Sequence, residues 1–159
     1  MIIDHTYFAQ DPIYISGITN VKDDVPTSFA QSLIDSVTTY ISIYEPRFLR
    51  LLLGADMAAT AESDPDIVSL LRDETSKQSP IANYVYFYWL RTHLTVLTPA
   101  GEKIQRGEYS DMANPRLRAV ELWNNMVDEC CAILPQLIGK GAKPDCCSAI
   151  FEHINPYNL

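Results

Sequence analysis

The residue types in this chain that are most able to do chemistry include four cysteines. They form two adjacent pairs, Cys130-Cys131 and Cys146-Cys147. Four thiolates can bind a zinc ion, but structural zinc sites favour a gap of two or more residues between paired ligands. Adjacent cysteines also do not readily form a disulfide with each other. The pattern therefore favours reduced thiols in a cytoplasmic protein, some of them packed as small apolar side chains.

The three histidines are far apart in the sequence and lie in unrelated contexts: His5, His93 and His153. Neither a paired-histidine zinc motif, a glycine-rich phosphate loop nor a nucleophile elbow accompanies them. His93 falls within an apolar stretch, where a histidine is more often packed or part of an interface than a ligand. We therefore predict a protein that is not an enzyme, with no catalytic residue, no metal and no cofactor.

An acidic stretch between Asp56 and Glu74 contains six acids and one base. Carboxylates spaced like Asp64 and Asp66 can bind calcium or act as an acid and a base. Asp64 directly precedes Pro65, however, and this order is typical of a helix N-cap, close to which further acids are favourable. The pattern favours a structural role for these acids.

The chain has 159 residues, a net charge of −8 and a pI of about 4.7, and the length predicts one domain. An acidic surface disfavours binding to nucleic acid or to an anionic membrane, because both require basic groups. It does not exclude a surface past which DNA moves without binding. The N-terminal residues have neither a basic region nor a long apolar run, so no signal peptide is predicted.

The elements that must position these residues are predicted to be helices. We expect an all-α bundle of about five helices over residues 25–138, an irregular N-terminal arm over residues 1–24 and a loose C-terminal tail over residues 139–159. The tail is expected to pack on the bundle or to extend from it. The arm has room for one short strand, Ile13–Ile18.

Proline and glycine define the predicted ends of the helices. The first helix should begin with Asp24 as its cap and Pro26 in its first turn, and should be broken or redirected at Glu45-Pro46. After it we expect a short helix ending at Gly54, a connection over 55–63 and a helix from Asp64-Pro65. A helix from Ser79-Pro80 to about Leu97 and a polar loop over 99–113 follow. The last expected elements are a helix from Asn114-Pro115 that kinks or ends at Pro135, and a short helix near 146–153.

The helix that begins at Ser79-Pro80 is apolar on all sides, although polar residues interrupt it too often for a membrane span. We predict a core helix with a contribution to an interface, in which four side chains are mostly buried: Tyr84, Val85, Tyr88 and Trp89. In the first helix, the side opposite the apolar face is rich in serine and threonine. It is either a protein contact surface or simply an exposed face. The candidate interface residues are Ser32, Ser36, Thr39, Tyr84, Tyr88 and Trp89.

Three segments, "YEPRFLRLLLGADM", "SPIANYVYFYWLR" and "RLRAVELWNNMVDE", resemble small all-helical proteins of Bacteroidetes phages and prophages. In layout that group resembles the head–tail connector proteins of tailed phages, also called adaptor or head-completion proteins. The similarity extends over roughly residues 25–135 and leaves out the arm and the tail. Its motifs are packing motifs and contain no catalytic residue.

The resemblance implies a structural virion protein that forms a homo-oligomeric ring and contacts portal and tail proteins. Such a protein would be cytoplasmic in the bacterial host before it becomes part of the virion. The acidic composition adds the expectation of no sequence-specific nucleic-acid contact and no membrane contact. The alternative is another non-enzymatic interaction or regulatory module of a phage or mobile element. An enzyme with an unrecognised helical active site is a third possibility.

Overall fold

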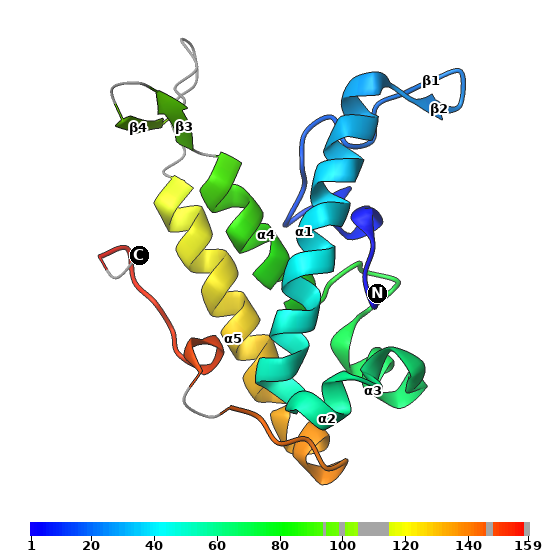
Figure 1. The fold of residues 1–159 in the computed structure, drawn as a ribbon, viewed down its shortest axis with the longest axis vertical. Coiled ribbons are helices and arrows are strands. Elements are labelled where there is room, and N and C mark those ends of the chain that lie inside the picture. The colour runs from blue at the N-terminus through cyan, green and yellow to red at the C-terminus, as the bar shows by residue number, and fades with distance from the viewer. Residues whose placement is uncertain (94, 99–100, 105–114, 146–147, 158–159) are drawn as a thin grey trace.

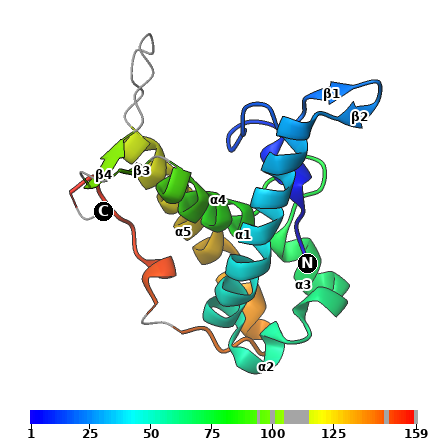
Figure 2. The same ribbon diagram turned by 45° about the horizontal axis from the view of Figure 1, so that its top comes forward.

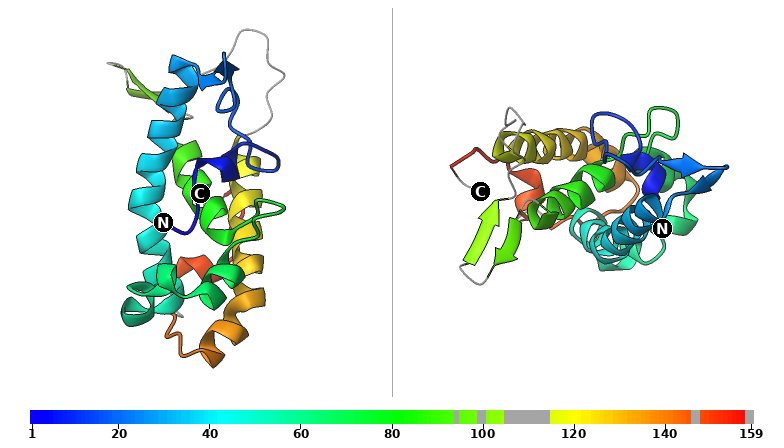
Figure 3. Two further views of the ribbon diagram at one scale, coloured as in Figure 1. Left: turned by 90° about the vertical axis from the view of Figure 1, so that its right-hand side faces the viewer. Right: turned by 90° about the horizontal axis from the view of Figure 1, so that it is seen from above.

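The computed structural model describes residues 1–93, 95–98, 101–104, 115–145 and 148–157. It confirms the mostly helical bundle, whose helices are α1 (Ser28–Leu53), α2 (Ala55–Ala58), α3 (Pro65–Leu71), α4 (Pro80–His93) and α5 (Pro115–Gly139). Three 3-10 turns, η1 (His5–Phe8), η2 (Ala61–Ser63) and η3 (Ala149–Phe151), lie between or beyond them. The long helices pack side by side, with α4 between α1 and α5 (Figure 1; Figure 3).

Two antiparallel hairpins add to the helices that the sequence predicts. Strands β1 (Val21–Lys22) and β2 (Val25–Pro26) precede α1, and strands β3 (Thr95–Thr98) and β4 (Gly101–Ile104) follow α4. Both hairpins lie at the same end of the bundle and project away from it (Figure 2). The prediction that the fourth helix reaches Leu97 was wrong, because α4 ends at His93 and the chain then enters β3. The expected loop over 99–113 contains β4, and its remaining residues lie outside the described part.

The start of α1 differs from the predicted start. Asp23 and Asp24 have positive φ values of 53° and 61° and form the turn of the first hairpin, a conformation that aspartate tolerates better than most residues. The N-cap is Thr27, whose hydroxyl accepts a hydrogen bond from the Ala30 amide at 3.2 Å. Asp24 and Pro26 were therefore misassigned to the helix.

Neither internal proline ends its helix, so the predicted break at Pro46 does not occur. Helix α1 continues through Pro46 to Leu53, and Gly54 is its C-cap as expected. Pro46 and Ser42, the residue whose carbonyl loses its helical partner, are both exposed, so water can replace the missing hydrogen bond. Beyond Pro46, α1 buries four large apolar side chains that favour its continuation: Phe48, Leu49, Leu52 and Leu53. Helix α5 likewise continues past the exposed Pro135 to Gly139.

The predicted starts of α3 and α4 are confirmed. Asp64 accepts hydrogen bonds from the amides of Asp66 and Ile67, which is the cap predicted from its place before Pro65. The Ser79 hydroxyl accepts from the Ile81 amide at 3.1 Å and donates to the Leu71 carbonyl at 2.7 Å. The expected cap at Asn114 lies outside the described residues. The connection over 55–63 is more ordered than expected, since it forms α2 and η2.

The N-terminal arm is irregular, as predicted, but its apolar side chains belong to the same core as the helices. The predicted strand Ile13–Ile18 does not form, and turns occupy most of that stretch. The buried residues of the arm are Ile2, Ile3, Tyr7, Phe8, Ile13, Ile15 and Ile18. The arm therefore contributes directly to the hydrophobic core.

The C-terminal tail packs on the bundle, and its described part is held by specific hydrogen bonds. The amides of Lys143 and Asp145 donate to the carbonyls of Leu53 and Leu51, both at 2.9 Å, and so satisfy the end of α1. Further along, η3 covers part of the helix expected near 146–153, and residues 146–147 lie outside the described part. The first part of the tail is thus bound to the end of α1.

Candidate functional site

One face of α1 carries the serines and threonine that the sequence suggests as interface residues. At roughly 100° per residue, Ser32, Ser36 and Thr39 fall on one side of the helix together with Phe29 and Ile43. Phe29 is 60% exposed and Ile43 is 57% exposed, whereas the opposite side of α1 is in the core. The face therefore combines small hydroxyl residues with a large exposed apolar side chain towards each end.

The hydroxyl of Thr39 on this face, and that of the neighbouring Ser42, bond within their own helix. Thr39 Oγ1 donates to the Asp35 carbonyl at 2.8 Å, and Ser42 Oγ donates to the Thr39 carbonyl at 2.7 Å. Such bonds to the preceding turn satisfy a hydroxyl without a partner. Any association through this face would therefore depend on Phe29 and Ile43 more than on the hydroxyl groups.

Beside this face, α1 and α4 are joined by five half-exposed or exposed rings that we call the aromatic ladder: Tyr40, Tyr44, Tyr88, Trp89 and His93. Tyr44 stacks on Tyr88 with ring centroids 4.3 Å apart, and Trp89 stacks on His93 at 4.2 Å. Tyr40 links the two stacks, because its ring lies 5.8 Å from both Tyr44 and His93. Rings that are partly exposed in this way are common in protein interfaces.

The predicted burial of the α4 aromatics is confirmed in part. Tyr84 and Val85 are fully buried, and Tyr84 packs against Phe48 and Trp123 in the core. Burial raises the pKa of the Tyr84 hydroxyl well above its ordinary value. Tyr88 and Trp89 remain half-exposed in the single chain. Of the three aromatic candidates, only Tyr88 and Trp89 can contact a partner directly.

One arginine lies over a ring of the aromatic ladder, and a second lies over Phe87, which packs beside Tyr88. The Arg47 guanidinium lies 5.9 Å from the centre of the Tyr88 ring, and the Arg91 guanidinium lies 5.5 Å from the centre of the Phe87 ring. Both arginine residues are exposed. The ladder is therefore a surface of aromatic rings with positive charge at its border, in a protein whose net charge is negative.

The β1–β2 hairpin presents exposed apolar side chains at this end of the bundle. Val21 is 63% exposed and Val25 is 62% exposed. Val21 pairs with Pro26, and Val25 pairs with Lys22, so the two valines lie on opposite faces of the hairpin. Asp23 and Asp24 form its tip. The hairpin thus offers apolar side chains on both faces behind a negatively charged turn.

The groups that could do chemistry are not brought together. Cys130 is buried, which raises the pKa of its thiol, and Cys131 is exposed, while the second cysteine pair lies outside the described residues. The His153 ring bonds to the Asp128 carboxylate at 2.9 Å. Asp66 pairs with Lys140, and Asp64 caps α3, as the structural interpretation of the acidic stretch expects. Within the described part, no group of three or more metal-ligating side chains forms a site.

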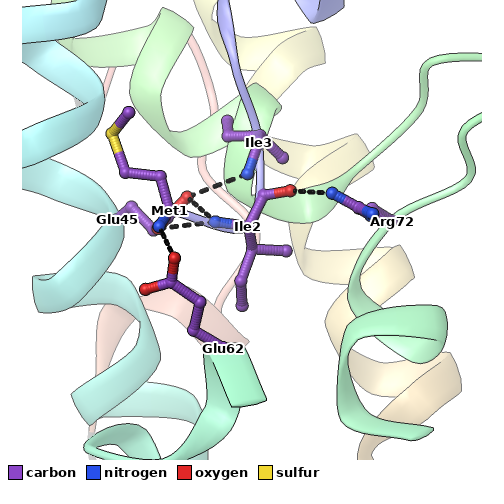
Figure 4. A network of polar contacts seen from close by, with 6 residues as sticks. All are labelled: Met1, Ile2, Ile3, Glu45, Glu62 and Arg72. Carbon is purple, nitrogen blue, oxygen red and sulfur yellow. Dashed lines mark hydrogen bonds and ion pairs between the residues drawn. The ribbon is translucent and has the colours of Figure 1, made fainter. Parts of the chain in front are cut away.

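Sequence reasoning missed a buried carboxylate, Glu45, that binds the arm (Figure 4). Its oxygens accept from the Ile2 amide at 2.9 and 3.0 Å and from the Ile3 amide at 3.1 Å. Arg72 donates to the Ile2 carbonyl at 2.6 Å, and the ammonium of Met1 pairs with Glu62. Burial raises the pKa of Glu45, and the amide hydrogen bonds oppose that shift. The sequence signal for this role was the position of Glu45 on the apolar side of the helix.

Sequence reasoning also missed Asn124. Its side-chain amide donates to the Ile154 carbonyl at 3.1 Å and accepts from the Ile154 amide at 2.9 Å. The neighbouring Trp123 indole donates to the Glu152 carbonyl at 2.9 Å. By pairing with both the amide and the carbonyl of Ile154, the Asn124 side chain satisfies the two backbone groups that a neighbouring strand could otherwise satisfy. These contacts fix the tail on α5.

The structure offers no membrane-spanning candidate in its described part, since none of those helices is both long and apolar enough.

Comparison of the chain with protein-family models, with curated proteins and with solved structures found no match.

Proposed function

We propose that this protein is a structural subunit that acts by self-assembly and protein–protein contacts, as a head–tail connector of a tailed phage or prophage does. The observation that carries the proposal is the exposed apolar β1–β2 hairpin together with Phe29 at the adjoining start of α1. Exposed apolar residues gathered at one end of a small bundle favour burial against another chain. The three segments that resemble phage proteins support the same class of function.

The proposed contact joins two different surfaces of neighbouring copies. The hairpin presents Val21 and Val25 with the acidic turn Asp23-Asp24, whereas the aromatic ladder presents rings bordered by Arg47 and Arg91. The two surfaces complement each other in apolar character and in charge. A contact between unlike surfaces can be repeated from one copy to the next. The copies then form a closed ring when the rotation that relates neighbouring copies divides a full turn. This arrangement is compatible with a connector ring.

Light scattering over a range of concentrations, alone and with portal and tail proteins encoded beside the gene, tests the proposal. We expect a single oligomeric species and binding to the portal protein. A strict monomer that binds neither portal nor tail proteins would contradict the connector function. Portal, capsid and tail genes on either side would favour the connector over a regulatory module of a mobile element.

A further inference from the structure

A second polar feature, remote from the proposed contact, is the carboxylate of Glu129 on α5. It is half-buried, and one of its oxygens accepts a hydrogen bond from the Asn83 side-chain amide of α4 at 3.1 Å. Asn83 itself is only 6% exposed. None of the ion pairs among the described residues includes Glu129. Carboxylates that lose part of their hydration are normally paired with a cation, and Glu129 has no such partner among the residues that the structure describes.

Glu129 lies between two neighbouring cavities. The larger, of about 260 Å³, is formed by the end of α3, the loop that follows it and α5, and its apolar wall contains Leu70, Pro80 and Ile133. The smaller, of about 110 Å³, is lined by the polar side chains of Gln78, Asn83 and Asn125. Glu129, Gln78 and Ser79 belong to both cavities. The carboxylate therefore meets an apolar space on one side and side-chain amides on the other.

The two cations that line these cavities are engaged elsewhere. Arg72 pairs with Glu74 and donates to the Ile2 carbonyl at 2.6 Å. The Lys77 ammonium lies 5.0 Å from the centre of the Tyr7 ring. The remaining charged group, Asp73, accepts hydrogen bonds from Thr75 and Ser76. Neither cation neutralises Glu129 in this structure.

We propose that Glu129 and Asn83 form a binding site for a primary alkylammonium group, whose aliphatic stem lies in the larger cavity. An alkylammonium is a compact charge that can donate a hydrogen bond to the Glu129 oxygen that Asn83 does not contact. Carbonyl oxygens of the amides in the smaller cavity can accept the remaining ammonium hydrogens.

The cavity size sets the class of ligand. A volume of about 260 Å³ lies below the roughly 300–1,000 Å³ that is usual for drug-sized ligands, so the space suits a short unbranched stem. The ammonium could come from a small free amine or from a lysine side chain of another protein. Both sources share the chemistry that Glu129 would recognise.

Titration of the full chain with n-butylammonium, followed by NMR at the Asn83 side-chain amide and the Glu129 carboxyl, tests the site. The neutral n-butanol is the ligand control. Glu129→Gln removes the charge, and Glu121→Gln removes the same charge from an exposed position of the same helix. We expect a saturable response to the amine alone, weakened by about tenfold or more in Glu129→Gln, because a charge-assisted hydrogen bond is lost. Glu121→Gln should respond like the wild type.

A response that persists unchanged in Glu129→Gln, or that n-butanol reproduces, would overturn the proposal, and so would the absence of any saturable response. Thermal unfolding of each variant verifies that it is folded during the titration. A blocked lysine amide provides the second arm of the experiment. Tighter binding of blocked lysine than of n-butylammonium would assign the site to a protein side chain, and the reverse order would assign it to a free amine.

Discussion

The carboxylate of Glu45, in the middle of α1, accepts two hydrogen bonds from the amide of Ile2, at 2.9 and 3.0 Å. A third bond, from the Ile3 amide, completes the attachment of the arm. The two partners are 43 residues apart in sequence. This contact anchors the start of the arm to the bundle next to the core that its isoleucines help to form.

Glu45→Gln should lower the free energy of unfolding by about 2–3 kcal/mol, because the new amide turns a donor towards backbone amides that need acceptors. Urea denaturation measures this loss. The exposed Glu121→Gln on α5 is the matched control and should stay within about 0.5 kcal/mol of the wild type. Equal stabilities of the two variants would show that the carboxylate does not hold the arm.

The pH dependence of stability should carry a contribution from Glu129. Burial raises its pKa above the ordinary value of 4.5, and the hydrogen bond from Asn83 only partly offsets that shift. Arg72, Asp73 and Lys77 are the other charged groups that line its cavities. A raised folded-state pKa means that the contribution is fully present below the unfolded pKa and is lost as the pH rises through the folded value.

The wild type should therefore lose stability relative to Glu129→Gln as the pH rises from about 4 to about 7. Urea denaturation at a series of pH values gives the difference between the two proteins, and the carboxyl NMR signal of Glu129 gives its pKa directly. A difference that is constant with pH, or a pKa at or below the ordinary value, would contradict the burial of an unpaired carboxylate.

Asn124→Ala should release the tail from α5, because it removes both hydrogen bonds to Ile154. We expect a loss of about 1–2 kcal/mol and faster hydrogen exchange at the Ile154 amide. Asn125→Ala changes the same residue type at the next, exposed position and is the control. Unaltered hydrogen exchange at the Ile154 amide in Asn124→Ala would show that Asn124 does not fix the tail on α5.

Local signals in the sequence were sufficient for the starts of α3 and α4. Asp64 and Ser79 each precede a proline and accept their capping hydrogen bonds from amides two or three residues further on, so a pattern of a few letters contains the whole cap. The all-round apolar pattern of α4 likewise predicts its burial, and Tyr84 and Val85 confirm it.

Contacts between distant segments could not be predicted in this way. The rule that proline ends a helix is local, whereas the burial of Phe48 and Leu52 beyond Pro46 depends on packing against other elements. The roles of Glu45 and Asn124 depend on backbone groups of the arm and the tail, whose places on the bundle no local pattern specifies. The proposed contact surface was anticipated on α1 and α4, but the hairpin was not.

The charge complementarity of the proposed contact makes association sensitive to salt. Replacing Asp23 and Asp24 by asparagine keeps residues that tolerate positive φ and removes both charges from the hairpin tip. We expect this variant to assemble more weakly than the wild type at low ionic strength and to depend less on salt. Sedimentation velocity at two salt concentrations measures both effects. Identical salt dependence of the two proteins would exclude the acidic tip from the contact.

Native mass spectrometry of the wild type and of Val25→Asp tests the central claim, self-assembly through the β1–β2 hairpin, most directly. Ile138→Asp is the control, because it places the same charge at another exposed aliphatic residue, far along α5. We predict one closed oligomer for the wild type and for Ile138→Asp, and mainly monomer for Val25→Asp. A wild type that stays monomeric at every concentration, or a Val25→Asp variant that assembles like the wild type, would contradict the account.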